Sequence, residues 1–206
     1  GLLAGRRHET SWLTDDGGDD GRLDFYDAKG VLELVLTRLG LDAKFEPVAH
    51  PTFHPGRCAV IKSGDTSLGF VGEVHPTVKE RFGLDFAKLA AFEIDLGCLL
   101  AVLPVSQRQF QPLSRFPAAL RDLALVVPSD VSAGRVREII HRHRLVAGVE
   151  LFDNYTGENV GHGEKSLAFH IYFQSSDRTL TNDEVNRSLD GLLRTLEREV
   201  NASLRS

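Results

Sequence analysis

The segment that most narrows the folds open to this chain is residues 163–186. Within it, four large apolar residues alternate with smaller or polar ones: Leu167, Phe169, Ile171 and Phe173 against Ala168, His170, Tyr172 and Gln174. This period of two, rich in aromatic and β-branched residues, predicts a half-buried strand. His170 and Tyr172 then lie on the face turned away from the core. Thr181 with Glu184 three residues later has the spacing of a capping box, which predicts a helix reaching about Asn201.

The same analysis predicts a complete small domain around this segment. Strands are expected at 121–127, 149–155, 167–173 and, briefly, 202–205, with helices at 133–144 and 182–201. The order βαββαβ is that of a ferredoxin-like plait, whose two helices cover one face of an antiparallel sheet. The inner helix positions are predicted to be Val136, Ile139, Ile140, His143, Val185, Leu189, Leu192, Leu193, Leu196 and Val200. Alternation assigns to the free sheet face Ala124, Val126, Phe152, Asn154, His170 and Tyr172.

The first half of the chain predicts a second α+β domain with a largely antiparallel sheet. Strand-like segments are 1–5, 10–13, 45–48, 59–62, 67–74 and 91–96, with a two-residue turn at Gly64-Asp65; helices are expected at 27–39, 76–83 and 96–102. The inner stripe of the first helix is predicted to be Val31, Leu34, Val35 and Leu39. Residues 15–21 predict a solvated loop. The polar segment 105–112 predicts a linker between a domain at 1–104 and one at 113–206.

Two groups of residues in the first half allow a catalytic or metal-binding interpretation. His50, His54 and Cys58 are spaced by four, as zinc ligands can be, but Pro51 and Pro55 prevent the helix that would align them. A turn leading into a hairpin is the alternative. Glu93 and Asp95 alternate along one predicted strand, which allows an acid–base pair or a polar sheet face.

Composition and charge narrow the class of protein. Cys58 and Cys98 lie in apolar sequence and are expected to be reduced thiols. No run of 18 apolar residues is present, and no signal peptide is recognised. We therefore expect a cytoplasmic protein without a membrane partner. Residues 1–104 hold 11 basic and 16 acidic residues, whereas residues 105–206 hold 13 of each. A neutral second domain is not an obvious nucleic-acid binder. It contains a cluster of four basic residues, Arg135, Arg137, Arg142 and Arg144. These can either complement the helix dipole near the helix C-terminus or contact RNA.

Several motifs resemble one family. The segments KSLAFHIYFQSSDRTLTNDEV, RFPAALRDLALVVP and VELFDNYTG are similar to the ferredoxin-fold anticodon-binding domain of the bacterial phenylalanyl-tRNA synthetase β subunit. Upstream, DFYDAKG, FHPGRCAVI, GFVGEVHP and AAFEIDL resemble the catalytic-like module of the same subunit. The sequence begins with Gly and contains no Met, so we expect a piece of a longer protein.

The resemblance implies a division of labour. The domain at 1–104 would be an incomplete copy of the class II synthetase core that packs against the α subunit in an α2β2 heterotetramer. ATP, Mg²⁺ and phenylalanine would act in the α subunit, since neither of the class II ATP-binding motifs is found here, and we expect no catalytic residue, metal or cofactor in this chain. The domain at 113–206 would bind the anticodon stem-loop of tRNA(Phe). The residues expected to contact RNA are Arg115, Arg121, Phe152, His170, Tyr172 and Arg178.

Two other functions remain open from the residues. A ferredoxin-like plait also serves as a protein-interaction or regulatory module without RNA binding, since fold does not fix function. A metal-dependent enzyme using His50 and His54 is the other alternative.

Overall fold

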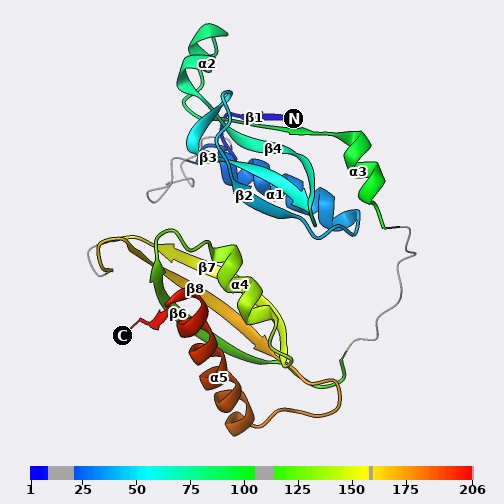
Figure 1. Ribbon diagram of the computed structural model, residues 1–206, viewed down its shortest axis with the longest axis vertical. Helices are drawn as coiled ribbons and strands as arrows, with labels where there is room; N and C mark the ends of the chain where they lie inside the picture. Colours follow the sequence, from blue (N-terminus) through cyan, green and yellow to red (C-terminus); the bar gives the residue numbers. More distant parts are fainter. Residues whose placement is uncertain (9–20, 105–113, 158–159, 206) are drawn as a thin grey trace. The chain divides into compact units, whose positions relative to one another are not determined.

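The computed structural model describes residues 1–8, 21–104, 114–157 and 160–205 (Figure 1). The predicted strand at 10–13, nearly all of the predicted loop at 15–21 and the predicted linker at 105–112 lie outside the described residues. Contacts divide the chain into two compact units, Gly1–Gln109 and Phe110–Ser206. Each unit has its own hydrophobic core and is described separately below.

The first unit is built on a five-stranded antiparallel sheet with the order β1-β5-β4-β3-β2. Its strands are β1 (Leu2–Ala4), β2 (Lys44–Pro47), β3 (Phe53–Ser63), β4 (Thr66–Val74) and β5 (Leu89–Ile94). The β3–β4 hairpin turns at Gly64, whose φ of +56° suits a glycine, so the predicted two-residue turn is confirmed. The helices are α1 (Phe25–Arg38), α2 (Pro76–Arg81) and α3 (Leu96–Val102).

The helix α1 packs on one face of this sheet through a different stripe from the one predicted. Ala28, Leu32 and Leu36 are buried, and they pack with a group of sheet residues that includes Ile61 and Val71. The predicted inner residues all remain at least 39% exposed: Val31, Leu34, Val35 and Leu39. The helix carries two adjacent apolar stripes, and tertiary packing uses the one spaced i, i+4, i+8.

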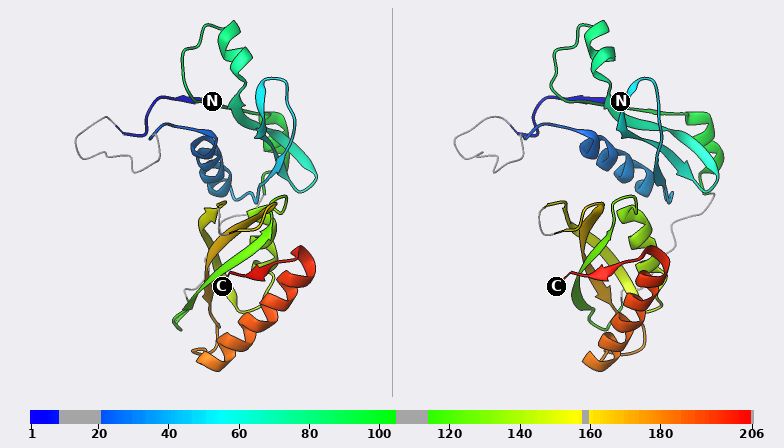
Figure 2. Two further views of the ribbon diagram at one scale, coloured as in Figure 1. Left: turned by 90° about the vertical axis from the view of Figure 1, so that its left-hand side faces the viewer. Right: turned by 60° about the vertical axis from the view of Figure 1, so that its left-hand side comes forward.

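The second unit is an antiparallel sheet with the order β7-β8-β6-β9, covered on one face by two helices (Figure 2). Along the chain its elements are β6 (Ala119–Pro128), α4 (Ala133–His141), β7 (Val146–Tyr155), β8 (Glu164–Phe173), α5 (Asn182–Val200) and β9 (Ser203–Leu204). The element order βαββαβ and this strand order confirm the predicted ferredoxin-like plait.

The core of the second unit forms where the apolar face of β8 meets the two helices. Leu167, Phe169, Ile171 and Phe173 have no exposed surface, which confirms the predicted inward face. Val136, Ile139 and Ile140 of α4 are also buried in this core, as are four of the six predicted positions of α5. Burying side chains of this size contributes roughly 1.5–3 kcal/mol each, so this layer stabilises the unit and fixes which sheet face is covered.

Both ends of α5 are closed by local sequence. The Thr181 hydroxyl accepts a hydrogen bond from Glu184 N at 3.3 Å, and the Thr181 N–H donates to Glu184 Oε2 at 3.0 Å, which confirms the capping box. At the other end Asn201 adopts the left-handed conformation, with φ of +51°. No helix in the described part of the chain is long and apolar enough to cross a membrane.

Candidate nucleic-acid interface

The sheet face of the second unit that α4 and α5 leave uncovered carries a pair of stacked rings. Phe152 of β7 and His170 of β8 lie with centroids 4.1 Å apart and planes 19° from parallel. The His170 Nδ1–H donates to Asp122 Oδ1 across the strand pair, at 2.7 Å, which fixes the orientation of the imidazole. Phe152 is 52% exposed. The more exposed ring of the stack, Phe152, is therefore available to contact a ligand.

Tyr172 lies on the same face, two residues further along β8. Its hydroxyl donates to Glu150 Oε2 at 3.2 Å. Its ring lies over Gly148 of β7, where a Cβ would come within 3.3 Å of the ring. Partial desolvation, and next the Glu150 carboxylate, raise the pKa of Tyr172 above its ordinary value. We call Phe152, His170 and Tyr172 the aromatic platform.

A β-bulge sets which residues of β7 join this face. The pairing shifts between Leu151, opposite Phe169, and Asp153, opposite Ala168, so Phe152 is the extra residue. Beyond the bulge the alternation is reversed. Asn154 lies opposite Leu167, on the helix-covered side, and the prediction that Asn154 belongs to the free face is wrong. Cross-strand partners share a face, so Asp153 takes that place.

The hydrogen-bond partners of the platform are carboxylates. Asp122 holds His170 and Glu150 holds Tyr172, while Asp153 adds a third acid on this face. Negative charge repels phosphate groups, but it accepts hydrogen bonds from the N–H groups of bases. The platform therefore suits the faces and donor edges of bases. Sequence reasoning missed Asp122 and Glu150, although Asp122 is the charged residue at the start of the apolar run LALVV, a signal that was available.

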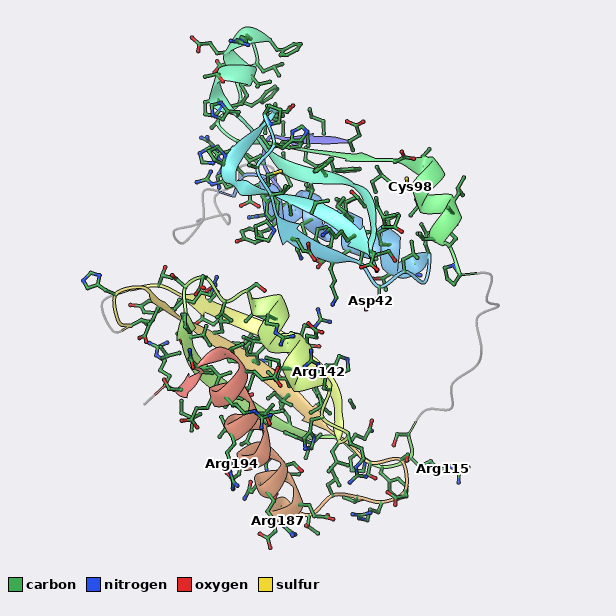
Figure 3. The ribbon with its side chains drawn as sticks, viewed as in Figure 1. Asp42, Cys98, Arg115, Arg142, Arg187 and Arg194 are labelled. Atoms are coloured by element: carbon green, nitrogen blue, oxygen red, sulfur yellow. The ribbon has the colours of Figure 1, made fainter. Side chains whose placement is uncertain are left out.

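Two of the three arginines expected to contact RNA are held by other groups, and they do not lie on the platform. Arg121 is opposite the core residue Ile171, and its guanidinium donates to Asn182 Oδ1 at 3.0 Å, at the start of α5. Arg178 donates to Glu184 Oε1 at 2.6 Å and also pairs with Asp177. Arg115 is exposed just before β6, beside the loop that joins β8 to α5 (Figure 3).

The basic cluster of α4 divides into paired and unpaired members. Arg135 and Arg142 both form ion pairs with Glu138 of α4 and with Glu199 of α5, and the pairs with Glu199 link the two helices. These two arginines therefore have a structural role. Arg137 and Arg144 are exposed and have no ion pair within the described residues.

In the first unit, most of the residues considered as metal ligands or as an acid–base pair are engaged in packing and helix capping. His50 packs between the rings of Phe53 and Phe70, and Cys58 is buried in β3, where burial raises the pKa of its thiol. No group of three potential metal ligands occurs among the described residues. The prediction that Asp95 belongs to a strand is wrong. Asp95 is the N-cap of α3 and accepts a hydrogen bond from Cys98 N at 2.9 Å.

Comparison with known proteins assigns both units. Residues 1–96 match the phenylalanyl-tRNA synthetase beta chain CLM domain, and residues 114–205 match the ferredoxin-fold anticodon binding domain. The chain is 38% identical over its whole length to a phenylalanine–tRNA ligase beta subunit of Dehalococcoides mccartyi, 41% identical over its whole length to one of Synechococcus elongatus, and 43% identical over 90% of its length to one of Moorella thermoacetica. It covers 25%, 26% and 23% of these relatives, about a quarter of their length. With two domains of this subunit matched in order along nearly all of its residues, the chain belongs to the phenylalanyl-tRNA synthetase beta subunit family.

Proposed function

We propose that the second unit binds the anticodon stem-loop of tRNA(Phe) and that the aromatic platform stacks its unpaired bases. The observation that carries this proposal is the exposed Phe152–His170 stack on the sheet face opposite the two helices. Single-stranded RNA is recognised through bases that stack on aromatic side chains and offer their edges to hydrogen-bonding groups. Asp122 and Glu150 are placed to orient the platform and to accept such hydrogen bonds.

The first unit has a role in assembly under this proposal. The exposed stripe of α1, comprising Val31, Leu34, Val35 and Leu39, gives an apolar surface of the kind found at subunit interfaces. We assign it to contact with the α subunit of an α2β2 enzyme in the cytoplasm. ATP, Mg²⁺ and phenylalanine would act in that α subunit. This chain would serve recognition and assembly, without forming or breaking bonds.

Alanine variants of the platform test the RNA-binding proposal. Phe152→Ala and Tyr172→Ala should each weaken tRNA(Phe) binding by about 1–3 kcal/mol, the value of one stacked base. Leu151→Ala is the matched control, because Leu151 is similarly exposed but lies opposite Phe169 on the helix-covered side. Affinity is measured by fluorescence titration, and the folded fraction by circular dichroism.

The outcomes separate the candidate functions. A loss confined to the two platform variants supports stacking on this face. Equal affinity in all three variants would remove the platform from the binding site. Failure of the unaltered chain to bind tRNA(Phe) would favour the protein-interaction alternative.

A further inference from the structure

An open hollow lies at one end of the second unit, beyond the last residues of β8. Its volume is about 480 Å³. Its walls come from the segment that leads into β6, from the turn between α4 and β7 with the first residues of β7, and from the start of the loop after β8: Ser114, Arg144, Leu145, Val146, Ala147, Gln174, Ser175 and Ser176. Three chain segments that are distant in sequence therefore meet around one space.

The charge of this hollow is positive. Among its lining residues only Arg144 is ionised at neutral pH. Arg144 is exposed, and it has no ion pair within the described residues, in contrast to Arg142, which binds both Glu138 and Glu199. Burial, and next the nearby Arg144 charge, lower the pKa of neighbouring His143. An anion entering the hollow would meet an uncompensated guanidinium.

Hydrogen bonds hold the rim in place without the help of any ligand. The Ser114 hydroxyl donates to Ser175 O at 3.3 Å, which ties the start of the unit to the loop after β8. The Gln174 amide donates to Phe116 O at 2.7 Å across the same junction. The nearby Asp177 carboxylate is engaged by the Ser175 hydroxyl and by Arg178. No ion pair joins this carboxylate to Arg144 within the described residues.

Two lining residues of the hollow lie close along the chain to residues at the platform. Gln174 follows Tyr172 by two residues, a rise of about 7 Å along an extended chain. Ala147 precedes Gly148, over which the Tyr172 ring lies. The acidic platform and the cationic hollow are thus neighbours, one suited to base edges and the other to phosphate.

We propose that this hollow is a phosphate subsite, in which Arg144 binds a backbone phosphate of the RNA whose base stacks on Tyr172. The inference rests on the proposed function, and it adds Arg144 to the interface in place of Arg178, which is bound to Glu184. Arg115 follows Ser114 and is exposed.

The test compares two single-charge deletions, Arg144→Gln and Arg137→Gln. Both arginines are exposed and without an ion pair among the described residues, but Arg137 lies within α4 and does not line the hollow. Binding of tRNA(Phe) is titrated at several salt concentrations. Arg144→Gln should weaken binding and make the slope of log K against log salt shallower by about 0.7 to 1, the loss of one phosphate contact. Arg137→Gln should leave the slope unchanged.

Each result decides the proposal. Equal effects of both variants would mean that Arg144 acts only through long-range charge, and an unchanged slope for Arg144→Gln would exclude the hollow as a phosphate subsite. In both cases the unaltered chain still binds, so the proposed function stands. Absence of binding by the unaltered chain overturns the proposed function and this subsite together. Thermal unfolding of both variants confirms that each is folded.

Discussion

Individual side chains in the second unit hold the interface in place through specific polar contacts. Asp122 orients His170, Glu150 orients Tyr172, and Glu184 holds both the start of α5 and Arg178. Hydrogen bonds from Arg178, and then from the Thr181 backbone, lower the pKa of Glu184 to about 2. A carboxylate held in this way stabilises the fold only while it is ionised.

Glu184→Gln should therefore lower the melting temperature in a pH-dependent manner. The folded pKa of about 2 lies below the ordinary value of 4.5, so the stabilisation is complete above about pH 4.5 and is lost as pH falls through about 2. The amide keeps the shape of the side chain but loses the charge and one of the two acceptor oxygens. At pH 7 the unaltered chain should have a higher melting temperature than the variant, and the difference in melting temperature should vanish near pH 2.

Glu197→Gln is the control, since Glu197 is exposed on the same helix and has no ion pair in the described part of the chain. It should not lower the melting temperature at pH 7. A difference between the Glu184 variant and the unaltered chain that stays constant from pH 7 to pH 2 would contradict the role of charge.

Helices and strands are the scale at which the structure departs most from sequence-based expectation. The helix α1 has enough apolar residues for two stripes, and only packing on the sheet selects Ala28, Leu32 and Leu36. In β7 the bulge at Phe152 reverses the alternation, which moves Asn154 to the other side. Strand β8 has no such ambiguity, because its large residues without polar atoms, Leu167, Phe169, Ile171 and Phe173, all occur on one side of a strict period of two.

The two stripes of α1 should respond differently to substitution. Leu32→Ala should destabilise the first unit by about 2–5 kcal/mol, because it empties a buried position. Leu34→Glu, at a position that is 59% exposed, should leave the stability of the chain nearly unchanged but weaken its association with the α subunit. Urea unfolding and size-exclusion chromatography measure the two effects. Unimpaired association of the Leu34 variant would disprove the assembly role of this stripe.

For the molecule as a whole, two units with separate cores match two domains of the phenylalanyl-tRNA synthetase beta subunit in order. The acidic excess lies in residues 1–104, whereas the second half has equal numbers of acids and bases. Neutrality of the second half hides a local separation of charge, with carboxylates on the platform and an unpaired arginine at the hollow.

A chain with roles in recognition and assembly should have no activity of its own. Purified chain incubated with phenylalanine, ATP, Mg²⁺ and labelled pyrophosphate should give no phenylalanine-dependent exchange, because neither class II ATP-binding motif is present in its sequence. The same assay with a complete synthetase is the positive control. Exchange by this chain alone would show that it holds a catalytic site.

The sequence by itself determined the plait, the inward face of β8 and the capping box of α5. Each of these depends on local periodicity or on residues three positions apart, and so it can be read without knowing the fold. Only the tertiary structure decided which stripe of α1 packs on the sheet, the bulge that brings Phe152 onto His170, the pairing of Arg178 with Glu184 and the hollow at Arg144. These features arise where one element packs against or pairs with another, and contacts between distant segments choose among arrangements that local sequence leaves equal.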